Sequence, residues 1–304
     1  MLSLAAIMRN AYRAGIAVPA FNIPYLPMMA PVIRAVVDQD CFALVEVARL
    51  EWTKFEAGSP AAVMAEFQKW QAPEHVRLHL DHVPVIDEDR LPVDYLGIIR
   101  EAIALGYHSV MVDGSRLSLE DNIAATREVA ALAHAAGLPV EAELGAVLGH
   151  EDGPPPPYDE LFESGQGFTQ VDEAVRFVAE SGCDWLSVAI GSIHGAISGV
   201  YKDQKKISAR LNLDHLDRLR AAVDIPLVLH GGSGVQREYV LEAFRRGIAK
   251  INIGTEIRQA YEATLRASGD VSTAQGAVYE RTTWLIRDYF GLSGTRRQIA
   301  AEAV

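Results

Sequence analysis

Short apolar runs recur along the chain at intervals that are typical of alternating strands and helices. Eight runs, rich in Val, Ile and Leu, predict strands that are buried on both faces, as in a parallel sheet. They cover residues 17–23, 42–48, 76–80, 109–113, 139–143, 185–190, 226–230 and 249–253. Helical patterns follow most of them. Those at 118–136 and 171–181 are closed by Gly137 and Gly182, in the position expected for a C-cap.

Eight alternating units within about 250 residues are what a (β/α)8 TIM barrel requires. A doubly wound sheet is the competing architecture, but it usually has fewer strands and a Gly-rich first turn. The first turn here, residues 22–25, is not Gly-rich. We therefore predict an α/β protein with a single TIM-barrel domain over residues 1–304. The barrel covers about 1–267, and a helical extension covers about 268–304, with an additional helix at 277–290 after the one at 256–267.

Composition narrows the class of protein. The chain has 304 residues, of which 49% are hydrophobic and 22% charged, an ordinary globular mixture. The formal net charge of −12 argues against a nucleic-acid surface. Cys41 and Cys183 lie in different segments, as in reduced proteins without a disulfide framework. With no basic leader and no apolar run of roughly 20 residues, we expect a cytoplasmic protein with no membrane partner.

Three histidines lie at the ends of predicted strands. His82 follows Asp81 in the segment 78–82, while His194 and His230 are each followed by glycine. The carboxyl ends of the strands share one face of a TIM barrel, so these side chains should converge. A lone histidine in such a place is more often a packed or surface residue. Three in equivalent positions favour a catalytic metal site, which usually keeps three protein ligands and one open position.

Other polar residues lie on the same predicted strands. Strand alternation places His79 with Asp81, deeper in the barrel, where we expect it to be a hydrogen-bonded core residue. Asp113 and Glu143 end the fourth and fifth strands, so either could hold the metal or a second cation, or orient a histidine. A buried ion pair explains these two carboxylates equally well. The remaining histidines read as structural or exposed: His75, His108, His134 and His215.

Glycine-rich turns follow the seventh and eighth strands, at 230–234 (His-Gly-Gly-Ser-Gly) and 252–255 (Asn-Ile-Gly-Thr). Many TIM barrels bind phosphate with these loops, through backbone N–H groups and a helix N-terminus. The glycines allow close backbone approach, and the Ser and Thr add hydroxyl donors. The connections at 149–169 and 195–212 are unusually long, and long loops at this end of a barrel usually cover an active site.

These motifs together resemble the class II (metal-dependent) fructose-bisphosphate aldolase family, and especially its tagatose-bisphosphate branch. The resemblance runs from Ala17 to about Thr255. It is carried by segments 17–22, 79–82, 110–115, 140–145, 149–153 and 250–252, and by the two His-Gly motifs.

The resemblance implies a zinc-dependent aldolase that reversibly cleaves a phosphorylated ketose, similar to fructose- or tagatose-bisphosphate. The products would be dihydroxyacetone phosphate and an aldehyde. It implies Zn2+ as the catalytic ion, held by His82, His194 and His230, and a possible second divalent or monovalent cation. Glu143 and Asp113 match positions that bind an alternative or second cation.

The resemblance also implies roles in proton transfer and substrate binding. Asp81 matches the acid that transfers a proton, and Glu151 matches an acid of the active-site loop. The positions implied to bind the sugar phosphate are Asn22, Gly195, Gly231, Gly232, Ser233, Asn252, Gly254 and Thr255. Relatives are usually homodimers or homotetramers, so a homo-oligomer is expected.

The chain departs from the family pattern on the side of the aldehyde, so a divergent paralogue that uses a different aldehyde partner is one alternative. Segment 46–52 ends the second strand where many relatives have a small Ser/Gly stretch, and 196–202 resembles an insertion. Arg49 could meet a carboxylate or phosphate of the substrate, but we favour a surface pair with Glu51. Two arginines near the C-terminal helix are loose candidates for a far phosphate: Arg281 and Arg287.

Rival functions remain open from the sequence. Lys250 shares the inward face of its strand with Asn252, so a Schiff-base aldolase is one alternative. Another metal-dependent barrel enzyme, such as an isomerase or a hydrolase, is a second. A non-catalytic sugar-phosphate sensor is a third, although binding alone would not require Asp81.

Overall fold

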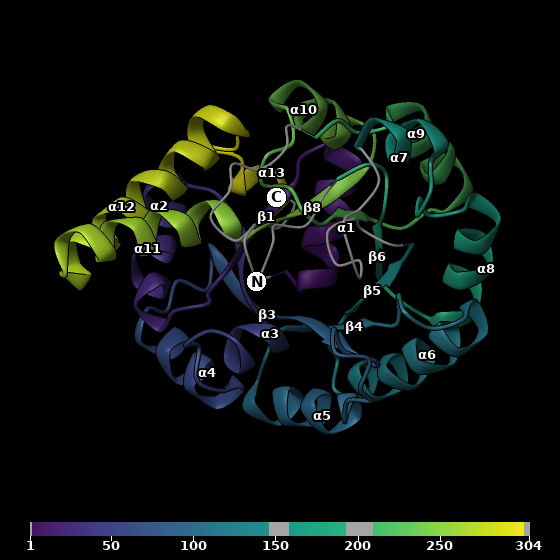
Figure 1. The fold of residues 1–304 in the computed structure, drawn as a ribbon, viewed down its shortest axis with the longest axis horizontal. Helices are drawn as coiled ribbons and strands as arrows, with labels where there is room; N and C mark the ends of the chain where they lie inside the picture. The colour runs from purple at the N-terminus through teal and green to yellow at the C-terminus, as the bar shows by residue number, and fades with distance from the viewer. Residues whose placement is uncertain (1, 146–157, 193–208, 301–304) are drawn as a thin grey trace.

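The computed structural model is a closed barrel of eight parallel strands that follow one another in sequence order (Figure 1). It describes residues 2–145, 158–192 and 209–300. The strands are β1 (Val18–Asn22), β2 (Ala43–Ala48), β3 (Val76–Pro84), β4 (Ser109–Asp113), β5 (Val140–Leu144), β6 (Trp185–Val188), β7 (Leu227–Leu229) and β8 (Ile248–Ile253). The predicted TIM barrel is confirmed, with every strand where the sequence placed one.

Helices form a ring around the barrel (Figure 1). They are α2 (Met29–Asp38), α4 (Pro60–Lys69), α5 (Tyr95–Leu105), α6 (Leu119–Ala135), α8 (Val171–Ser181), α9 (Leu213–Ala222), α10 (Arg237–Arg245) and α11 (Thr255–Ser268). The other elements are α1 (Leu4–Ala14), η1 (Leu26–Met28), α3 (Arg49–Thr53), α7 (Tyr158–Ser164), α12 (Val271–Trp284), η2 (Leu285–Tyr289) and α13 (Arg296–Ile299). The predicted helices at 118–136, 171–181 and 256–267 are confirmed.

The additional C-terminal helix is present, but its predicted start is wrong. Helix α12 begins at Val271, six residues before the predicted residue 277, and continues into the π-helical turn η2. The carboxylate of Asp270 accepts the Thr273 N–H at 2.8 Å and so caps the first turn. In Figure 1, α11 and α12 lie side by side next to α2 and extend beyond the ring of helices.

Helix α1 closes the N-terminal end of the barrel, and it lies behind the barrel centre in Figure 1. Ser3 caps its start, and Gly15 ends it in the left-handed conformation. The apolar face of α1 packs against residues at the strand starts, including Val18, Leu44 and Trp185. Because apolar side chains fill this end, the polar residues of the barrel interior gather towards the other end.

Polar and charged side chains occupy the interior beyond this apolar layer. The buried ones there that lie on strands are Glu46, His79, Asp81, Ser109, Glu141, Glu143, Ser187, Lys250 and Asn252. Burying such groups is costly unless each finds a partner of opposite charge or a hydrogen bond. The contacts among them therefore determine how the side chains at the barrel mouth are oriented.

Strand β3 extends to Pro84, beyond its predicted end at Leu80, and contains a bulge. It advances from Leu80 to Val83 while β4 advances only from Val110 to Val112, so β3 carries one extra residue. His82 lies in this bulge with a φ of 27°, a conformation that is uncommon for residues other than glycine. The bulge reorients the chain where the predicted site begins.

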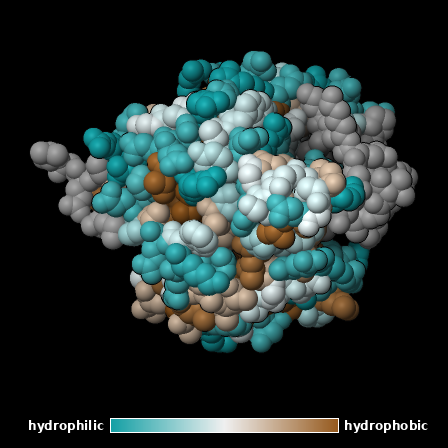
Figure 2. Space-filling view, turned by 90° about the vertical axis from the view of Figure 1, so that its left-hand side faces the viewer, coloured by the Kyte–Doolittle hydropathy of each residue, from teal (hydrophilic) through white to brown (hydrophobic). Residues whose placement is uncertain are grey.

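The surface gives no sign of a membrane-spanning element in the part of the chain that the structure describes. No helix there is both long enough and apolar enough to cross a bilayer. Figure 2 shows the side that carries α11 and α12, where hydrophobic patches alternate with hydrophilic areas. The large apolar side chains exposed among the described residues are scattered along the chain: Val37, Trp70, Leu91, Val175 and Val271.

Candidate active site

Asp81 lies at the barrel mouth between two asparagines. Asn22 Nδ2, at the end of β1, donates to Asp81 Oδ2 at 3.0 Å, and Asn252 Nδ2, on β8, donates to Oδ1 at 3.0 Å. Burial alone would raise the pKa of Asp81, but the charges of His82 and Lys250 outweigh burial and lower it to about 2. Asp81 is therefore ionised and held in place by both asparagines.

His82 and His230 come together beside Asp81. Their ring centroids lie 4.4 Å apart at an interplanar angle of 68°. One ligand atom from each of Asp81, His82 and His230 lies within 4.8 Å of the other two. Two of the three predicted histidine ligands thus converge as expected. The third, His194, lies outside the described residues, as do Gly195 and Glu151.

Asp113 and Glu143 reach the same two rings. His82 Nδ1 lies 3.2 Å from Asp113 Oδ2 and 3.8 Å from Glu143 Oε2, while His230 Nδ1 lies 3.2 Å from Glu143 Oε2. His82, Asp113 and Glu143 form a second group whose ligand atoms lie within 4.8 Å of one another. Asp113 also accepts from the Ser115 N–H and hydroxyl, at 3.0 and 2.6 Å. These contacts allow both cation binding and orientation of the rings.

The site stabilises positive charge. Burial would lower the pKa of His82, but mainly the charge of Asp81 raises it to about 9. For His230, burial is outweighed by hydrogen bonds with Glu141 and Glu143, which raise its pKa to about 10. Metal ions compete with protons for such nitrogens. A set of imidazole nitrogens and carboxylate oxygens around one point fits a divalent ion such as zinc.

Glu141 was not among the residues predicted for the site. Its Oε1 lies 2.7 Å from His230 Nε2, and its Oε2 accepts the Trp185 Nε1–H at 2.7 Å. A proton on Nε2 that points to Glu141 leaves His230 Nδ1 to face the site. The signal in the sequence was strand parity: Glu141 precedes Glu143 by two residues on β5 and must share its inward face.

Lys250 is completely buried among carboxylates. Its Nζ lies 2.9 Å from Glu141 Oε2, 3.1 Å from Glu46 Oε2 and 4.0 Å from Asp81 Oδ1. Burial would lower its pKa, but Glu141, Glu46 and Asp81 raise it above the ordinary value. A nucleophilic lysine requires a depressed pKa. The Schiff-base alternative therefore finds no support in the surroundings of Lys250.

His79 has the core position that strand alternation predicts. Its Nδ1 lies 2.7 Å from Ser109 Oγ, and its Nε2 lies 3.4 Å from Glu141 Oε2. The side chain is fully buried, and burial together with the charge of Lys250 lowers its pKa to about 3. The prediction that His79 is a hydrogen-bonded core residue is confirmed.

The turn after β7 is shaped by glycine. Gly231 has a φ of 68°, and a Cβ on Gly232 would lie 2.6 Å from Ile251 Cγ1, so a side chain at residue 232 would displace the buried Ile251 side chain of β8. The hydroxyl of Ser233 is buried and has no hydrogen-bond partner among the described residues. A buried hydroxyl in this state is suited to a ligand oxygen.

The turn after β8 leads directly into a helix. Gly254 precedes α11, whose first residue is Thr255, so backbone N–H groups of the first turn are directed towards this end of the barrel. A Cβ on Gly254 would lie 3.3 Å from Asn22 Oδ1. The side-chain oxygen of Asn252 is buried without a hydrogen-bond partner in the described part of the chain. The two turns lie next to each other, because a Cβ on Gly232 would lie 3.0 Å from the Asn252 carbonyl oxygen.

The predicted surface pair of Arg49 and Glu51 is wrong. Arg49 Nη1 lies 3.4 Å from Asp87 Oδ2. Glu51 is buried, and its Oε2 accepts the Ala48 N–H at 2.8 Å. Helix α3 begins at Arg49, so Glu51 lies in the first turn and folds back to cap the helix instead of facing its neighbour.

The two loose phosphate candidates both have partners. Arg281 Nη2 contacts the carboxylate of Glu256, and the guanidinium lies 4.3 Å from the ring centroid of Trp284. Arg287 Nη2 lies 2.8 Å from the carboxylate of its neighbour Asp288, and both side chains are exposed. Neither contact brings the guanidinium group of Arg281 or Arg287 to the Asp81 side chain.

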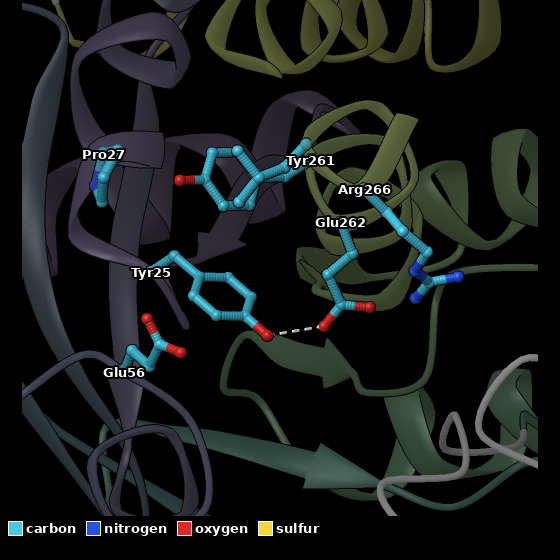
Figure 3. A pocket seen from close by; sticks show the side chains of 7 residues that line it. Tyr25, Pro27, Glu56, Tyr261, Glu262 and Arg266 are labelled. Carbon is cyan, nitrogen blue, oxygen red and sulfur yellow. Dashed lines mark hydrogen bonds between the residues drawn. The ribbon is translucent and has the colours of Figure 1, made fainter. Parts of the chain in front are cut away.

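A cavity of about 380 Å3 lies between the segment after β1 and helix α11 (Figure 3). The Tyr25 hydroxyl donates to Glu262 Oε1 at 2.7 Å across it, and the rings of Tyr25 and Tyr261 stack at 5.2 Å. Its lining residues are Tyr25, Pro27, Glu56, Tyr261, Glu262, Leu265 and Arg266. None of the groups around His82 and His230 lines it, so this cavity and the candidate metal site are distinct.

Comparison with known proteins decides the family. The model of the family "Fructose-bisphosphate aldolase class-II" matches residues 2–293. The chain belongs to the class II fructose-bisphosphate aldolase family. The resemblance found in its motifs is thereby confirmed. Proteins of this family are lyases that depend on a metal ion, and the chain is accordingly a class II aldolase.

Individual aldolases resemble the chain over nearly its whole length. The fructose-bisphosphate aldolase of Streptococcus pyogenes serotype M6 is 33% identical over 286 residues, which cover 92% of this chain and 87% of that protein. The crystal structure of the YdjI aldolase from Escherichia coli K12 matches with a TM-score of 0.76 and 29% identity, covering 97% of this chain and 100% of that one.

A more distant aldolase structure supports the fold alone. The structure of the fructose-bisphosphate aldolase from Campylobacter jejuni has a TM-score of 0.72 at 20% identity and covers 96% of both chains. The barrel architecture is therefore shared well beyond the range of clear sequence similarity.

Proposed function

We propose that this aldolase is zinc-dependent and reversibly cleaves a phosphorylated ketose, similar to fructose- or tagatose-bisphosphate, to dihydroxyacetone phosphate and an aldehyde. The observation that carries the proposal is the convergence of Asp81, His82 and His230, with ligand atoms within 4.8 Å of one another. In this proposal His82, His194 and His230 hold the ion, although His194 lies outside the described residues.

A divalent ion held by His82 and His230 would supply a Lewis acid for the negative charge that develops when the carbon–carbon bond breaks. Asp81 takes the proton from the C4 hydroxyl during cleavage and returns it during condensation. Its two hydrogen bonds from Asn22 and Asn252 keep both carboxylate oxygens in place, so the proton moves to an acceptor that needs no rearrangement.

The phosphate of dihydroxyacetone phosphate is assigned to the turns after β7 and β8. The Ser233 hydroxyl, which has no hydrogen-bond partner among the described residues, and the first turn of α11 at Gly254 and Thr255 support this assignment. Gly231 and Gly232 allow the phosphate to approach the backbone, and Gly195, outside the described residues, completes the proposed set. Asn252, through its side-chain oxygen, can accept a hydrogen bond from a substrate hydroxyl.

Further acids have proposed roles around this core. Glu143 and Asp113 bind an alternative or second cation, or hold the rings of His82 and His230, in keeping with their contacts of 3.2 Å. Glu151, in the loop outside the described residues, moves the proton at the nucleophilic carbon of dihydroxyacetone phosphate.

The proposal is tested with the zinc-loaded protein in two assays. The first follows exchange of deuterium from D2O into dihydroxyacetone phosphate, and the second follows cleavage of fructose and tagatose bisphosphates and condensation with a panel of aldehydes. We expect exchange and at least one carbon–carbon bond-forming reaction. Ligand binding with neither exchange nor condensation would contradict the proposal and indicate the sensor function.

We also propose that the chain forms one domain and assembles into a homodimer or homotetramer. The matches to class II aldolases over nearly the full chain support a single barrel unit with its helical extension. Light scattering after size-exclusion chromatography measures the assembly directly, and a monomer at all protein concentrations would contradict it.

A further inference from the structure

Lys250 joins the two functional halves of the candidate site. On one side its Nζ contacts Glu141 Oε2 at 2.9 Å, and the other oxygen of Glu141 contacts His230 Nε2 at 2.7 Å. On the other side Nζ lies 4.0 Å from Asp81 Oδ1, the oxygen that accepts from Asn252. The Lys250 ammonium group is thus linked to the proposed metal ligand His230 through Glu141, and it lies next to the proposed proton acceptor Asp81.

The contacts of Lys250 cross the barrel. Lys250 is on β8, Glu46 on β2, Asp81 on β3 and Glu141 on β5, and none of the last three strands is hydrogen-bonded to β8. The four side chains are at most 2% exposed. In such a low-dielectric interior an ammonium group strongly attracts each carboxylate. Because backbone pairing does not connect β8 to these three strands, the orientation of the three carboxylates depends on their contacts with Lys250.

Rotation of the Glu141 carboxylate is restricted by three contacts. Oε2 lies 2.9 Å from Lys250 Nζ and accepts the Trp185 Nε1–H at 2.7 Å, so Oε1 is left to contact His230. Without Lys250, Glu141 loses one of the two contacts that turn Oε1 towards the ring. His230 then loses part of the support that directs its Nδ1 to the site.

We propose that Lys250 is a positioning residue that holds Asp81 and, through Glu141, His230 in the geometry needed for proton transfer and metal binding. This role rests on the proposed zinc-dependent reaction. It differs from the nucleophile of a Schiff-base mechanism, because the ammonium group of Lys250 is engaged by three carboxylates. It differs also from mere charge balance, since it predicts changes in metal geometry and turnover as well as in stability.

Two variants test the role. Lys250→Met removes the ammonium alone, and Glu46→Gln combined with Lys250→Met removes one positive and one negative charge together, which protects folding. The control is Asp40→Asn combined with Arg296→Met, because Arg296 Nε lies 2.6 Å from Asp40 Oδ1 in a pair outside the barrel interior. Co2+ replaces zinc as the probe, since its absorption spectrum reports the coordination geometry.

We expect the Lys250 variants to bind Co2+ about 10- to 100-fold more weakly, the effect typical of lost support for a metal ligand. The absorption spectrum should change, and kcat should fall by a similar factor while KM stays within about twofold. The control pair should lower the melting temperature without changing the spectrum or kcat. Wild-type Co2+ affinity, spectrum and kcat in the Lys250 variants would overturn the inference.

Lys250→Arg covers the case in which neither variant folds. It keeps the charge but moves it away from the ammonium position. An altered Co2+ spectrum or a reduced kcat at unchanged KM supports the positioning role, and wild-type values for both overturn it. A borohydride-trapped adduct at Lys250 would also overturn it. Failure of the wild-type protein to bind Co2+ would overturn the proposed function together with this inference, whereas unchanged Lys250 variants overturn the inference alone.

Discussion

Glu141 Oε1 and His230 Nε2 lie 2.7 Å apart, and both side chains are completely buried. This contact determines which nitrogen of the ring is available at the barrel mouth, since the nitrogen that donates to Glu141 cannot also bind a metal ion. The orientation of a proposed ligand is thus set by a residue that is itself completely buried.

Replacing Glu141 with Gln should weaken metal binding while the fold is kept. The amide has the shape of the carboxylate but lacks its charge, and it can present its NH2 group to His230 instead of an oxygen. We therefore expect about tenfold weaker binding of Zn2+. Competition with a chromogenic chelator measures it. Glu120→Gln is the matched control, because it neutralises an exposed glutamate that pairs with Arg176 at 2.7 Å. Equal affinities in the two variants would refute the role of Glu141.

Asp81→Asn should keep the metal and lose the reaction. The amide cannot take a proton from a substrate hydroxyl, so kcat for cleavage should fall about 100- to 10,000-fold. Asp81→Ala should behave similarly. Elemental analysis of the purified variants should give the wild-type zinc content. Because Asp81 is assigned only to the C4 hydroxyl, both variants should still exchange deuterium into dihydroxyacetone phosphate. Substantial cleavage by either variant would show that the proton goes elsewhere.

His230→Ala should lose both metal and activity. Removing one of three ligands leaves a site with too few donors, so zinc content and cleavage should fall together. The control is His134→Ala, since His134 lies 2.8 Å from Asp184 in a partly exposed pair away from the site. Dialysis of the wild-type protein against a chelator should reproduce the loss, and added Zn2+ should restore activity. A zinc-replete His230→Ala protein would contradict the ligand assignment.

Glu51 should make stability depend on pH. Burial, only partly offset by the Ala48 N–H, raises the pKa of Glu51 to about 8 from 4.5. The unfolded chain therefore binds fewer protons between these values, so the stabilisation present below about pH 4.5 is lost as the pH rises through 8. Relative to Glu51→Gln, the wild-type free energy of unfolding should fall by up to about 1.4 kcal/mol per pH unit.

Urea unfolding between pH 5 and 8.5 measures this difference. Glu101→Gln, at an exposed position of α5, serves as the control and should follow the wild-type curve. Parallel curves for wild type and Glu51→Gln would mean that Glu51 ionises as freely in the folded protein as in the unfolded one.

Much of the barrel could be read from the sequence because strands buried on both faces are continuous apolar runs. The exception was β3, whose predicted end at Leu80 is four residues too early. His79, Asp81 and His82 interrupt its apolar pattern, since they point into a polar interior and not into the core. Similarly, the start of α12 was missed because Asp270 caps it locally while the helix has little amphipathic pattern.

The site was predicted in part. Strand ends brought His82 and His230 together, because chain direction and barrel closure suffice to determine which ends share a face. The individual contacts between side-chain oxygens and nitrogens could not be predicted in the same way, because they depend on the orientation of each side chain. The pairing of Arg49 with Asp87, for instance, depends on the residue at which α3 begins. A shift of that start by one residue would turn Arg49 to another side of the helix.

The extra residue in β3 has a consequence for attempts to transplant this chemistry. An ordinary pleat would send Asp81 and His82 to opposite sides of the wall, whereas here ligand atoms of both lie within 4.8 Å of one another. If only the side chains were copied onto a regular eight-stranded barrel, either Asp81 or His82 would face the interior, and the other would point outwards. The backbone irregularity at φ 27° would have to be grafted along with them.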